Sequence, residues 1–343
     1  MQYKRASFEP LRKSRYGIGF HWTTWTAPRE GAPKSFEEAV EAFDVDAFVQ
    51  QAVEAGAGHV LFTTTHAVHH LPGPNPEVDR LIAGRTCRRD LIMELAEGLA
   101  RANILFVAYY NHGTWSNPFG GRQDPEWQDA AGAREADRTR YNENYGRILR
   151  WMGEHYGPRI AAYWFDSGYE FIKYPDTPWY DFTMAAKAGY ADRLVTYNSG
   201  IDNYVAYTPY QDFWAGEVNR LDFRPDKPWP IEFAPHGPRT PGGLPWYAFT
   251  TWHKDPVFAP YGEWGINAEN RDLFWAPPDP FQIMAYLTRF RHVGGVVTFN
   301  LLCYQDGSAY DTDLQAMKQV KALFKHYGRR PWARAAAEDQ AAI

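Results

Sequence analysis

The chain lacks the features that mark disulfide-bonded or membrane proteins. It has only two cysteines, Cys87 and Cys303, in 343 residues, which indicates neither a disulfide framework nor a cysteine-rich metal motif. No run approaches the roughly 18 apolar residues of a membrane span, and no apolar stretch follows the basic first residues as it would in a signal peptide. The sequence as given therefore predicts a cytoplasmic protein with no membrane contact.

Excess positive charge and nucleotide-binding motifs are also missing. The net charge is −5, and no lysine or arginine cluster could neutralise a row of phosphates, which excludes a nucleic-acid binder. The chain has no P-loop, no G-x-S-x-G elbow and no G-x-G-x-x-G turn after an apolar run. Cys303 has no base beside it in sequence, so we predict that it lies in the core. No organic cofactor is indicated.

Aromatic residues, in contrast, are abundant. The chain contains 14 Trp, 22 Tyr and 21 Phe, which together make up 17% of its residues, and many lie next to Gly, Pro, Asp or His. Flat apolar rings with polar edges suit the stacking of sugar rings, but they also suit an ordinary core. Composition alone leaves both interpretations open.

Short apolar runs alternate with amphipathic stretches along the whole chain. Helical spacing predicts helices over 45–57, 88–103, 141–157 and 311–327. The apolar runs predict strands over 17–22, 59–64, 104–111, 159–166, 193–198, 210–218, 245–251 and 295–300. This alternation is typical of an α/β protein with a (β/α)₈ TIM-type barrel, and a doubly wound sheet is the alternative. Proline-rich connections such as 223–243 interrupt the series without ending it, so we predict one domain over 1–343 with a core at about 16–327.

Nearly every predicted strand ends in a side chain that can form hydrogen bonds or stack. In TIM barrels such strand ends carry the active site. A set of carboxylate, imidazole, amide and indole groups suits a hydroxylated ligand, so we expect a carbohydrate substrate. The strand-end residues are His21, Trp22, Thr65, His66, Tyr110, Asn111, His112, Asp166, Asn198, Glu217, Trp252, His253, Lys254 and Asn300.

Two of these residues are acids from separate strands. Asp166 ends the apolar run of AAYWFDSGYE, and Glu217 follows a later run. Glycoside hydrolysis uses such a pair without any metal, and in retaining enzymes the carboxyl groups lie about 5 to 5.5 Å apart. A single acid at a strand end can equally be a helix N-cap or an ion-pair partner.

A histidine cluster, H-x-x-H-H, is formed by His66, His69 and His70. It lacks the carboxylate of the H-E-x-x-H arrangement, so we expect no metal there. His69 and His70 are expected in a solvent-facing loop beside LPGPNP.

Several segments together resemble the α-L-fucosidases of glycoside hydrolase family 29. They are GIGFHW, FDVDAFVQQAVEAGAGHVLFTTTH, TCRRDLIMELAEGLARANILFVAYY and WFDSG, and the likeness extends over roughly 16–325. The resemblance implies a retaining exo-glycosidase with Asp166 as nucleophile and with His21 and Trp22 in contact with the sugar.

The same resemblance suggests where the acid/base lies. Some family members carry it in a D-F-x-x-x-E segment, which DFWAGE matches at Glu217, with Glu232 and Glu263 as alternatives. Further sugar contacts are expected from His66, Tyr110, His112, Trp252, His253 and Asn300.

The chain also departs from the family pattern. The family's K-H-H-D-G-F run is TTHAV here, with Ala67 in place of the second histidine, and its Asn-Asp-Arg is Asn198-Ser199-Gly200. We therefore expect fucose or a related sugar in a modified pocket. We also expect none of the C-terminal β-sandwich that many members carry.

Two other functions are also compatible with the sequence. A carbohydrate-binding barrel without turnover would fit the lost recognition groups. A metal-dependent sugar isomerase would need His21, His66 and His112 to converge with an acid.

Overall fold

The computed structural model describes residues 3–114, 123–201, 203–218, 237–253 and 262–327. Its eight strands are all parallel and hydrogen-bond in the order β5-β4-β3-β2-β1-β8-β7-β6. This arrangement confirms the predicted TIM-type barrel and its eight strands. Their bounds are β1 (Gly17–Phe20), β2 (His59–Thr65), β3 (Leu105–Asn111), β4 (Ala162–Asp166), β5 (Leu194–Tyr197), β6 (Glu217–Val218), β7 (Tyr247–Thr250) and β8 (Val296–Leu301).

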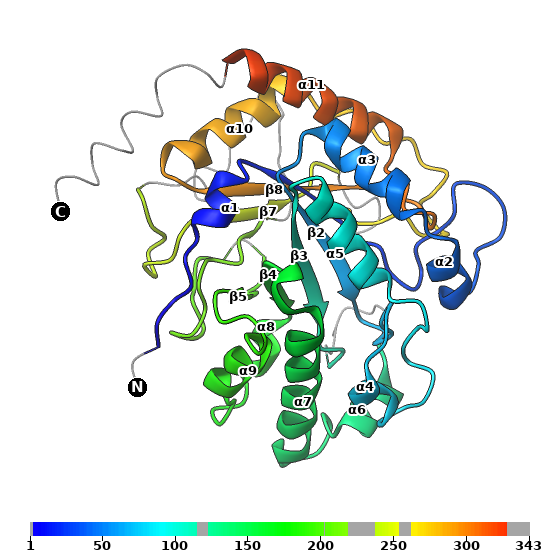
Figure 1. Cartoon of the computed structure of the whole chain (residues 1–343), viewed down its shortest axis with the longest axis vertical. Coiled ribbons are helices and arrows are strands. Elements are labelled where there is room, and N and C mark those ends of the chain that lie inside the picture. The colour runs from blue at the N-terminus through cyan, green and yellow to red at the C-terminus, as the bar shows by residue number, and fades with distance from the viewer. Residues whose placement is uncertain (1–2, 115–122, 202, 219–236, 254–261, 328–343) are drawn as a thin grey trace.

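The helices cover the outside of the strands (Figure 1). All four predicted helices are present, as α3, α5, α7 and α11, whereas the other helices, α9 and α10 among them, were not predicted. α10 begins where Asp279 accepts the Phe281 N–H, directly before Pro280. The helices are α1 (Glu9–Lys13), α2 (Phe36–Ala42), α3 (Val45–Ala55), α4 (Pro76–Asp79), α5 (Leu91–Arg101), α6 (Pro125–Ala131), α7 (Thr139–Tyr156), η1 (Gly157–Arg159), α8 (Gly168–Phe171), α9 (Trp179–Ala186), α10 (Pro280–His292) and α11 (Asp311–Tyr327).

The barrel closes between β5 and β6 through an irregular seam. The Asp212 N–H donates to the Val195 carbonyl of β5 at 2.8 Å, and the Phe249 N–H of β7 donates to the Gly216 carbonyl at 2.8 Å. From inside the barrel, the Trp164 indole N–H donates to the Ala215 carbonyl at 2.7 Å. The residues before β6 thus join β5 to β7, although β6 itself is much shorter than the predicted strand over 210–218.

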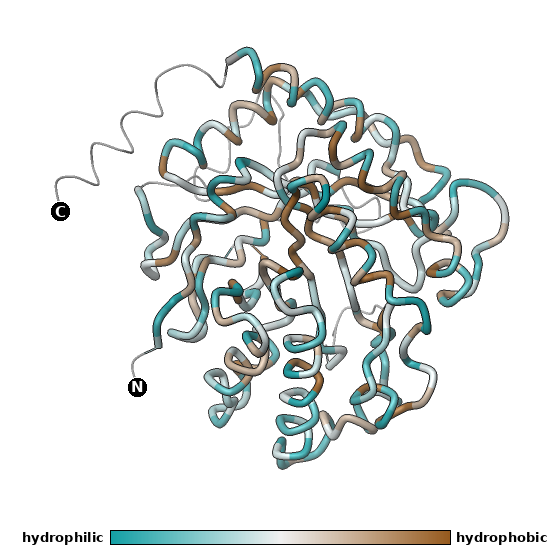
Figure 2. Tube along the Cα trace, viewed as in Figure 1, coloured by the Kyte–Doolittle hydropathy of each residue, from teal (hydrophilic) through white to brown (hydrophobic). Residues whose placement is uncertain are grey.

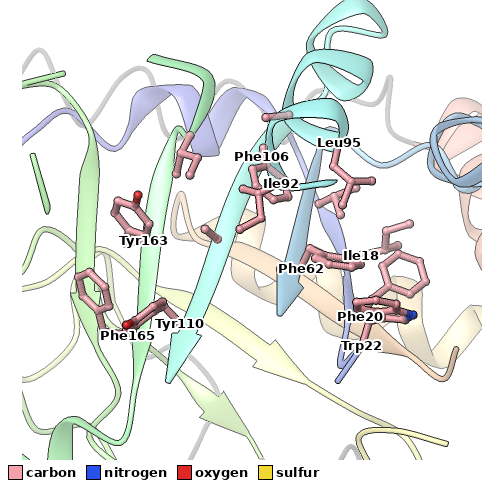
Figure 3. Packing of buried hydrophobic residues seen from close by; sticks show 14 of the residues in the cluster. Ile18, Phe20, Trp22, Phe62, Ile92, Leu95, Phe106, Tyr110, Tyr163 and Phe165 are labelled. Carbon is pink, nitrogen blue, oxygen red and sulfur yellow. The ribbon is translucent and has the colours of Figure 1, made fainter. Parts of the chain in front are cut away.

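Adjacent strand residues point to opposite sides of the sheet, as the strand period requires. Ile18, Phe20 and Phe62 belong to the cluster between strands and helices (Figure 3). Val107 and Trp164 belong to a second cluster inside the barrel. A strand-end side chain therefore points into the barrel or toward the helices according to whether its position along the strand is odd or even.

The strands and the outer helices also differ in hydropathy. Hydrophobic residues concentrate on the strands, and hydrophilic residues lie along the outer helices (Figure 2). Within the described part of the chain, no helix combines the length and apolar character needed to cross a membrane.

Candidate active site

Asp166 ends β4 inside the barrel and is held by neutral hydrogen-bond donors. Its Oδ2 accepts the Tyr109 hydroxyl at 2.6 Å and the Asn111 amide at 2.7 Å, and its Oδ1 accepts the Asn198 amide at 2.8 Å. Burial raises the pKa of the Asp166 carboxyl, but electrostatic interaction with His66 and the hydrogen bonds from Tyr109 and Asn198 outweigh it, and the pKa is lowered overall. Asp166 as a whole is 8% exposed and therefore buried at the carboxyl end of the barrel.

Glu217 lies across the barrel seam from Asp166. The Asn198 amide nitrogen that donates to Asp166 also donates to Glu217 Oε2 at 2.6 Å. The two carboxylate oxygens are therefore separated by no more than the sum of these two hydrogen bonds. That separation is compatible with the spacing of about 5 to 5.5 Å that retaining glycosidases use.

His21 follows β1 and forms one wall of the site. Its Nδ1 lies 2.9 Å from Asn300 Oδ1, while the Asn300 amide donates to the Trp264 carbonyl. Burial lowers the pKa of His21 to about 3, so the ring is neutral. Because Nδ1 faces a carbonyl oxygen, it carries the proton, which leaves Nε2 as an acceptor. The ring also stacks on Phe249, with the two centroids 5.5 Å apart.

His66 stands next to His21 with one polar atom unused. Its ring lies parallel to that of Tyr109 at 5.9 Å and meets the edge of Trp25 at 5.2 Å. Burial lowers the pKa of His66 below its ordinary value, which favours the neutral form. His66 Nδ1 is buried and has no hydrogen-bond partner among the described residues. A ligand hydroxyl would satisfy this nitrogen.

Two predicted sugar contacts, Trp22 and Tyr110, point away from this site. Trp22 is 1% exposed in the layer between strands and helices, and its indole donates to the Gln305 carbonyl at 2.9 Å. Tyr110 is fully buried in the same layer, where its hydroxyl lies 2.7 Å from His69 Nε2 (Figure 3). Tyr109, one residue earlier in β3, points inward and was not predicted.

His112 lies behind the site. Its Nε2 is 3.0 Å from the Ser167 carbonyl, directly after Asp166, and its ring packs on Phe171. Burial lowers the pKa of His112 to about 4. The ring thus supports the backbone that follows Asp166.

Trp252 and His253 follow β7 and contact a different acid. The Trp252 indole N–H lies 3.1 Å from Asp313 Oδ1, and His253 Nε2 lies 2.8 Å from the same oxygen. Asp313 stands in the first turn of α11. These contacts tie the end of β7 to α11 and place neither ring on Asp166.

Glu263, an alternative acid/base, is engaged with its own loop. Its Oε1 accepts the backbone N–H groups of Trp264 and Gly265 at 3.0 and 3.1 Å. The other alternative, Glu232, and the strand-end residue Lys254 lie outside the described residues. Glu217, in contrast to Glu263, shares a hydrogen-bond donor with Asp166, the Asn198 amide.

The predicted solvent-facing position of His69 is wrong. His69 is fully buried, and its ring stacks on Trp127 with centroids 3.7 Å apart. His70 is half-buried against Phe36. Within the described ranges, no three or more His, Cys, Asp or Glu side chains are grouped so that they could hold a metal ion.

Sequence and structure comparisons agree on the relatives of this chain. The model of the α-L-fucosidase family matches residues 1–230. A search of curated proteins found no match.

Three solved structures are similar over nearly the whole chain. α-L-Fucosidase isoenzyme 1 from Paenibacillus thiaminolyticus is 20% identical, with 93% of this chain and 75% of that chain covered and a TM-score of 0.64. A family 29 α-L-fucosidase from Bacteroides thetaiotaomicron, trapped as a covalent intermediate, is 16% identical, with 96% and 77% covered and a TM-score of 0.63. The α-L-fucosidase AlfC from Lactobacillus casei, in complex with α-L-fucose, is 16% identical, with 93% and 98% covered and a TM-score of 0.59.

Proposed function

Because the chain belongs to the α-L-fucosidase family and is a glycoside hydrolase of that type, we propose that it removes a terminal α-L-fucose or a related sugar with Asp166 as nucleophile and Glu217 as acid/base. The observation that carries the proposal is the Asn198 amide, which donates to both carboxylates at 2.8 and 2.6 Å. The hydrogen bonds from Tyr109 and Asn111 fix the direction of the Asp166 carboxylate.

The reaction proceeds in two steps with inverted roles for Glu217. In the first step Asp166 attacks the anomeric carbon, the bond to the aglycone oxygen breaks, and Glu217 gives its proton to that oxygen. In the second step Glu217 removes a proton from water, the water attacks the anomeric carbon, and the ester bond to Asp166 breaks. The sugar leaves with its anomeric configuration retained.

The wall of the pocket offers a mixed polar and aromatic surface to the sugar. His21 Nε2 and His66 Nδ1 are neutral imidazole nitrogens that suit hydroxyl groups. Tyr109 and Trp264 flank the His21 ring at 5.0 and 5.2 Å and suit the C–H face of the sugar. Ala67 and Gly200 add no polar side chain to this surface, so we propose that the preferred sugar can differ from fucose in one hydroxyl or its substituent.

Chemical rescue tests the nucleophile. A panel of aryl glycosides that includes the α-L-fucoside should show turnover by the wild type. Asp166→Ala should lower kcat by about 10³-fold or more, and added azide should partly restore product formation as a glycosyl azide. Hydrolysis that survives Asp166→Ala would remove Asp166 from the proposal, and turnover of no glycoside in the panel would remove the activity itself.

A matched pair of variants tests the acid/base in the same assay. Glu217→Gln should slow the hydrolysis of substrates with poor leaving groups and spare those with activated ones, because only the former need a proton. Glu263→Gln serves as the control and should not change this leaving-group dependence. The reverse pattern would transfer the role to Glu263.

A further inference from the structure

We propose that Asn198 is a positioning residue that stabilises the negative charge as it passes from Asp166 to Glu217, and that Gly200 holds the amide in the orientation this requires. The inference rests on the proposed function, since the charge transfer belongs to the two-step reaction.

The orientation of the Asn198 amide is set by a tight turn. Its Oδ1 accepts the Gly200 N–H at 2.9 Å, which directs the amino group toward the carboxylates. Gly200 has a φ of +96°, a backbone region that residues with a Cβ adopt only at a cost. A Cβ built on Gly200 would meet only Tyr169, at 3.8 Å, so the glycine is needed for its conformation and not for space.

A second turn of the same kind stands on the other side of Asp166. Asn111 at the end of β3 accepts the Gly113 N–H at 2.8 Å, and Gly113 has a φ of +73°. Both turns have the sequence Asn-x-Gly, and both direct an amino group at Asp166. They differ in the second amide hydrogen, because Asn111 donates to Ser167 Oγ, whereas Asn198 donates to Glu217.

The second contact of Asn198 matters because the negative charge changes place during the proposed reaction. Before the first step Asp166 carries the charge and Glu217 carries the proton. After it, Asp166 is a neutral ester and Glu217 is charged. An amide that donates to both oxygens stabilises the charge at either place without moving, so no reorganisation is needed. Asn111 can serve only Asp166.

Other titratable groups face Asp166 and Glu217, and none of them is changed in the Asn198 and Asn111 variants. They come from the carboxyl ends of β1, β2 and β3 and from α8, and they interact electrostatically with Asp166 or Glu217; they are His21, His66, Tyr109, His112 and Tyr169.

The pH dependence of kcat/KM for an aryl α-L-fucoside separates the two asparagines. Loss of a donor to a carboxylate raises the pKa of that carboxyl. Asn198→Ala should therefore move both limbs of the profile to higher pH, and it should lower the maximum about ten- to a hundred-fold. Asn111→Ala, the matched control, should move the acid limb alone. Limbs that stay in place in Asn198→Ala would overturn the inference.

Gly200 provides a milder test in the same turn. Gly200→Ala should shift both limbs in the same direction as Asn198→Ala. Gly200→Asn should lose less activity than Gly200→Ala, because asparagine tolerates the left-handed backbone better. Equal losses in the two glycine variants, or a lower activity in Gly200→Asn, would contradict the role assigned to the turn. Thermal unfolding of each variant identifies any that fail to fold.

A titration that needs no substrate keeps this inference separate from the proposed function. The carboxyl carbons of ¹³C-labelled Asp and Glu can be followed by NMR and assigned with Asp166→Asn and Glu217→Gln. Asn198→Ala should raise the apparent pKa values of both carboxyls, and Asn111→Ala only that of Asp166. If this holds and no glycoside is turned over, the function fails and the coupling stands. If turnover is present and only one carboxyl responds to Asn198→Ala, the coupling fails and the function stands.

Discussion

The two ends of the barrel each bury an aspartate, and the two are held in opposite ways. At the carboxyl end, Asp166 is bound by a hydroxyl and two amides, and a second carboxylate shares one of these amides. At the amino end, Asp212 lies 2.8 Å from the Lys187 ammonium. It also accepts the Val195 N–H of β5 at 2.8 Å.

The amino end is further closed by the start of the chain. The Tyr3 hydroxyl and the Ala6 N–H both donate to Asp212 at 2.9 Å. Phe8 and Leu11 pack into the cluster inside the barrel. The Asp212 side chain is thus fully buried, and its negative charge is balanced by the Lys187 ammonium.

The two aspartates differ in how far the fold uses up their charge. In a carboxylate that is paired with a cation and with backbone N–H groups, the charge and the lone pairs are already used in interactions that stabilise the fold. Asp166 instead accepts hydrogen bonds from a hydroxyl and two amides, which leave its negative charge in place. Burial alone does not distinguish the two.

Removal of the charge on Asp212 should give the largest loss of stability. Asp212→Asn leaves the Lys187 ammonium buried without its counter-charge, which should cost about 3–5 kcal/mol of unfolding free energy. Urea unfolding measures this loss. The double variant Lys187→Gln/Asp212→Asn should recover part of it, and turnover per folded molecule should change little in both. A loss of turnover with unchanged stability would assign Asp212 to the active site and contradict its purely structural role.

Two adjacent tyrosines of β3 contact different environments, Tyr109 the Asp166 carboxylate and Tyr110 the His69 ring. Tyr109→Phe removes a donor to Asp166 and should lower kcat/KM about ten- to a hundred-fold with little effect on stability. Tyr110→Phe removes the contact with His69 and should cost about 1 kcal/mol of stability with turnover unchanged. Steady-state kinetics and thermal unfolding of both variants decide the matter. Similar kinetic losses would contradict the opposite directions of the two side chains.

A buried histidine at each end should make the fold sensitive to acid. Burial lowers the pKa of His59 to about 3, and the ring is held between Ser14 Oγ and Thr298 Oγ1 at 2.7 and 2.6 Å. An unfolded histidine titrates near 6.5, so between about pH 6.5 and 3 the unfolded chain binds more protons, and stability falls as the pH falls. At pH 5.5 His59 should account for roughly 1 kcal/mol of this loss.

Variants at the two ends separate stability from function in this pH window. His59→Gln should flatten the dependence of the unfolding free energy on pH between 6.5 and 5.5 and leave turnover unchanged. His21→Gln should flatten it similarly, because burial lowers the pKa of His21 to about 3 as well, but it should also raise KM. An unchanged slope in His59→Gln would show that this ring is not the source of acid sensitivity.

The sequence predicted the barrel and one acid better than it predicted the directions of side chains. The repeated apolar runs located the strands, and the end of the fourth run located Asp166. At the end of β3 the predicted sugar contact is Tyr110, although Tyr109 lies on the same face as Asn111 and Asp166. The strand period could have corrected this choice, and also the choice of Trp22 beside His21.

Other features could not be predicted from local pattern. β6 contains only Glu217 and Val218, because the residues before it are placed by contacts with β5, β7 and Trp164. The Asx turn of Asn198 follows from its sequence, but the contact with Glu217 depends on how the barrel closes. Trp25 and Trp264 reach the histidines from loops, whose paths no periodicity describes.

The irregular seam between β5 and β6 bears on how the enzyme tolerates thermal motion. Asn198 stands on one side of this seam and Glu217 on the other, so the amide that joins the two acids also spans the joint. Any opening of the barrel at this joint would therefore change the distance between the Asp166 and Glu217 carboxylates. The closure of the barrel thus sets the spacing of the two carboxylates, and hydrogen exchange at the Val195 and Asp212 amides, which bond across the seam, would report how often it opens.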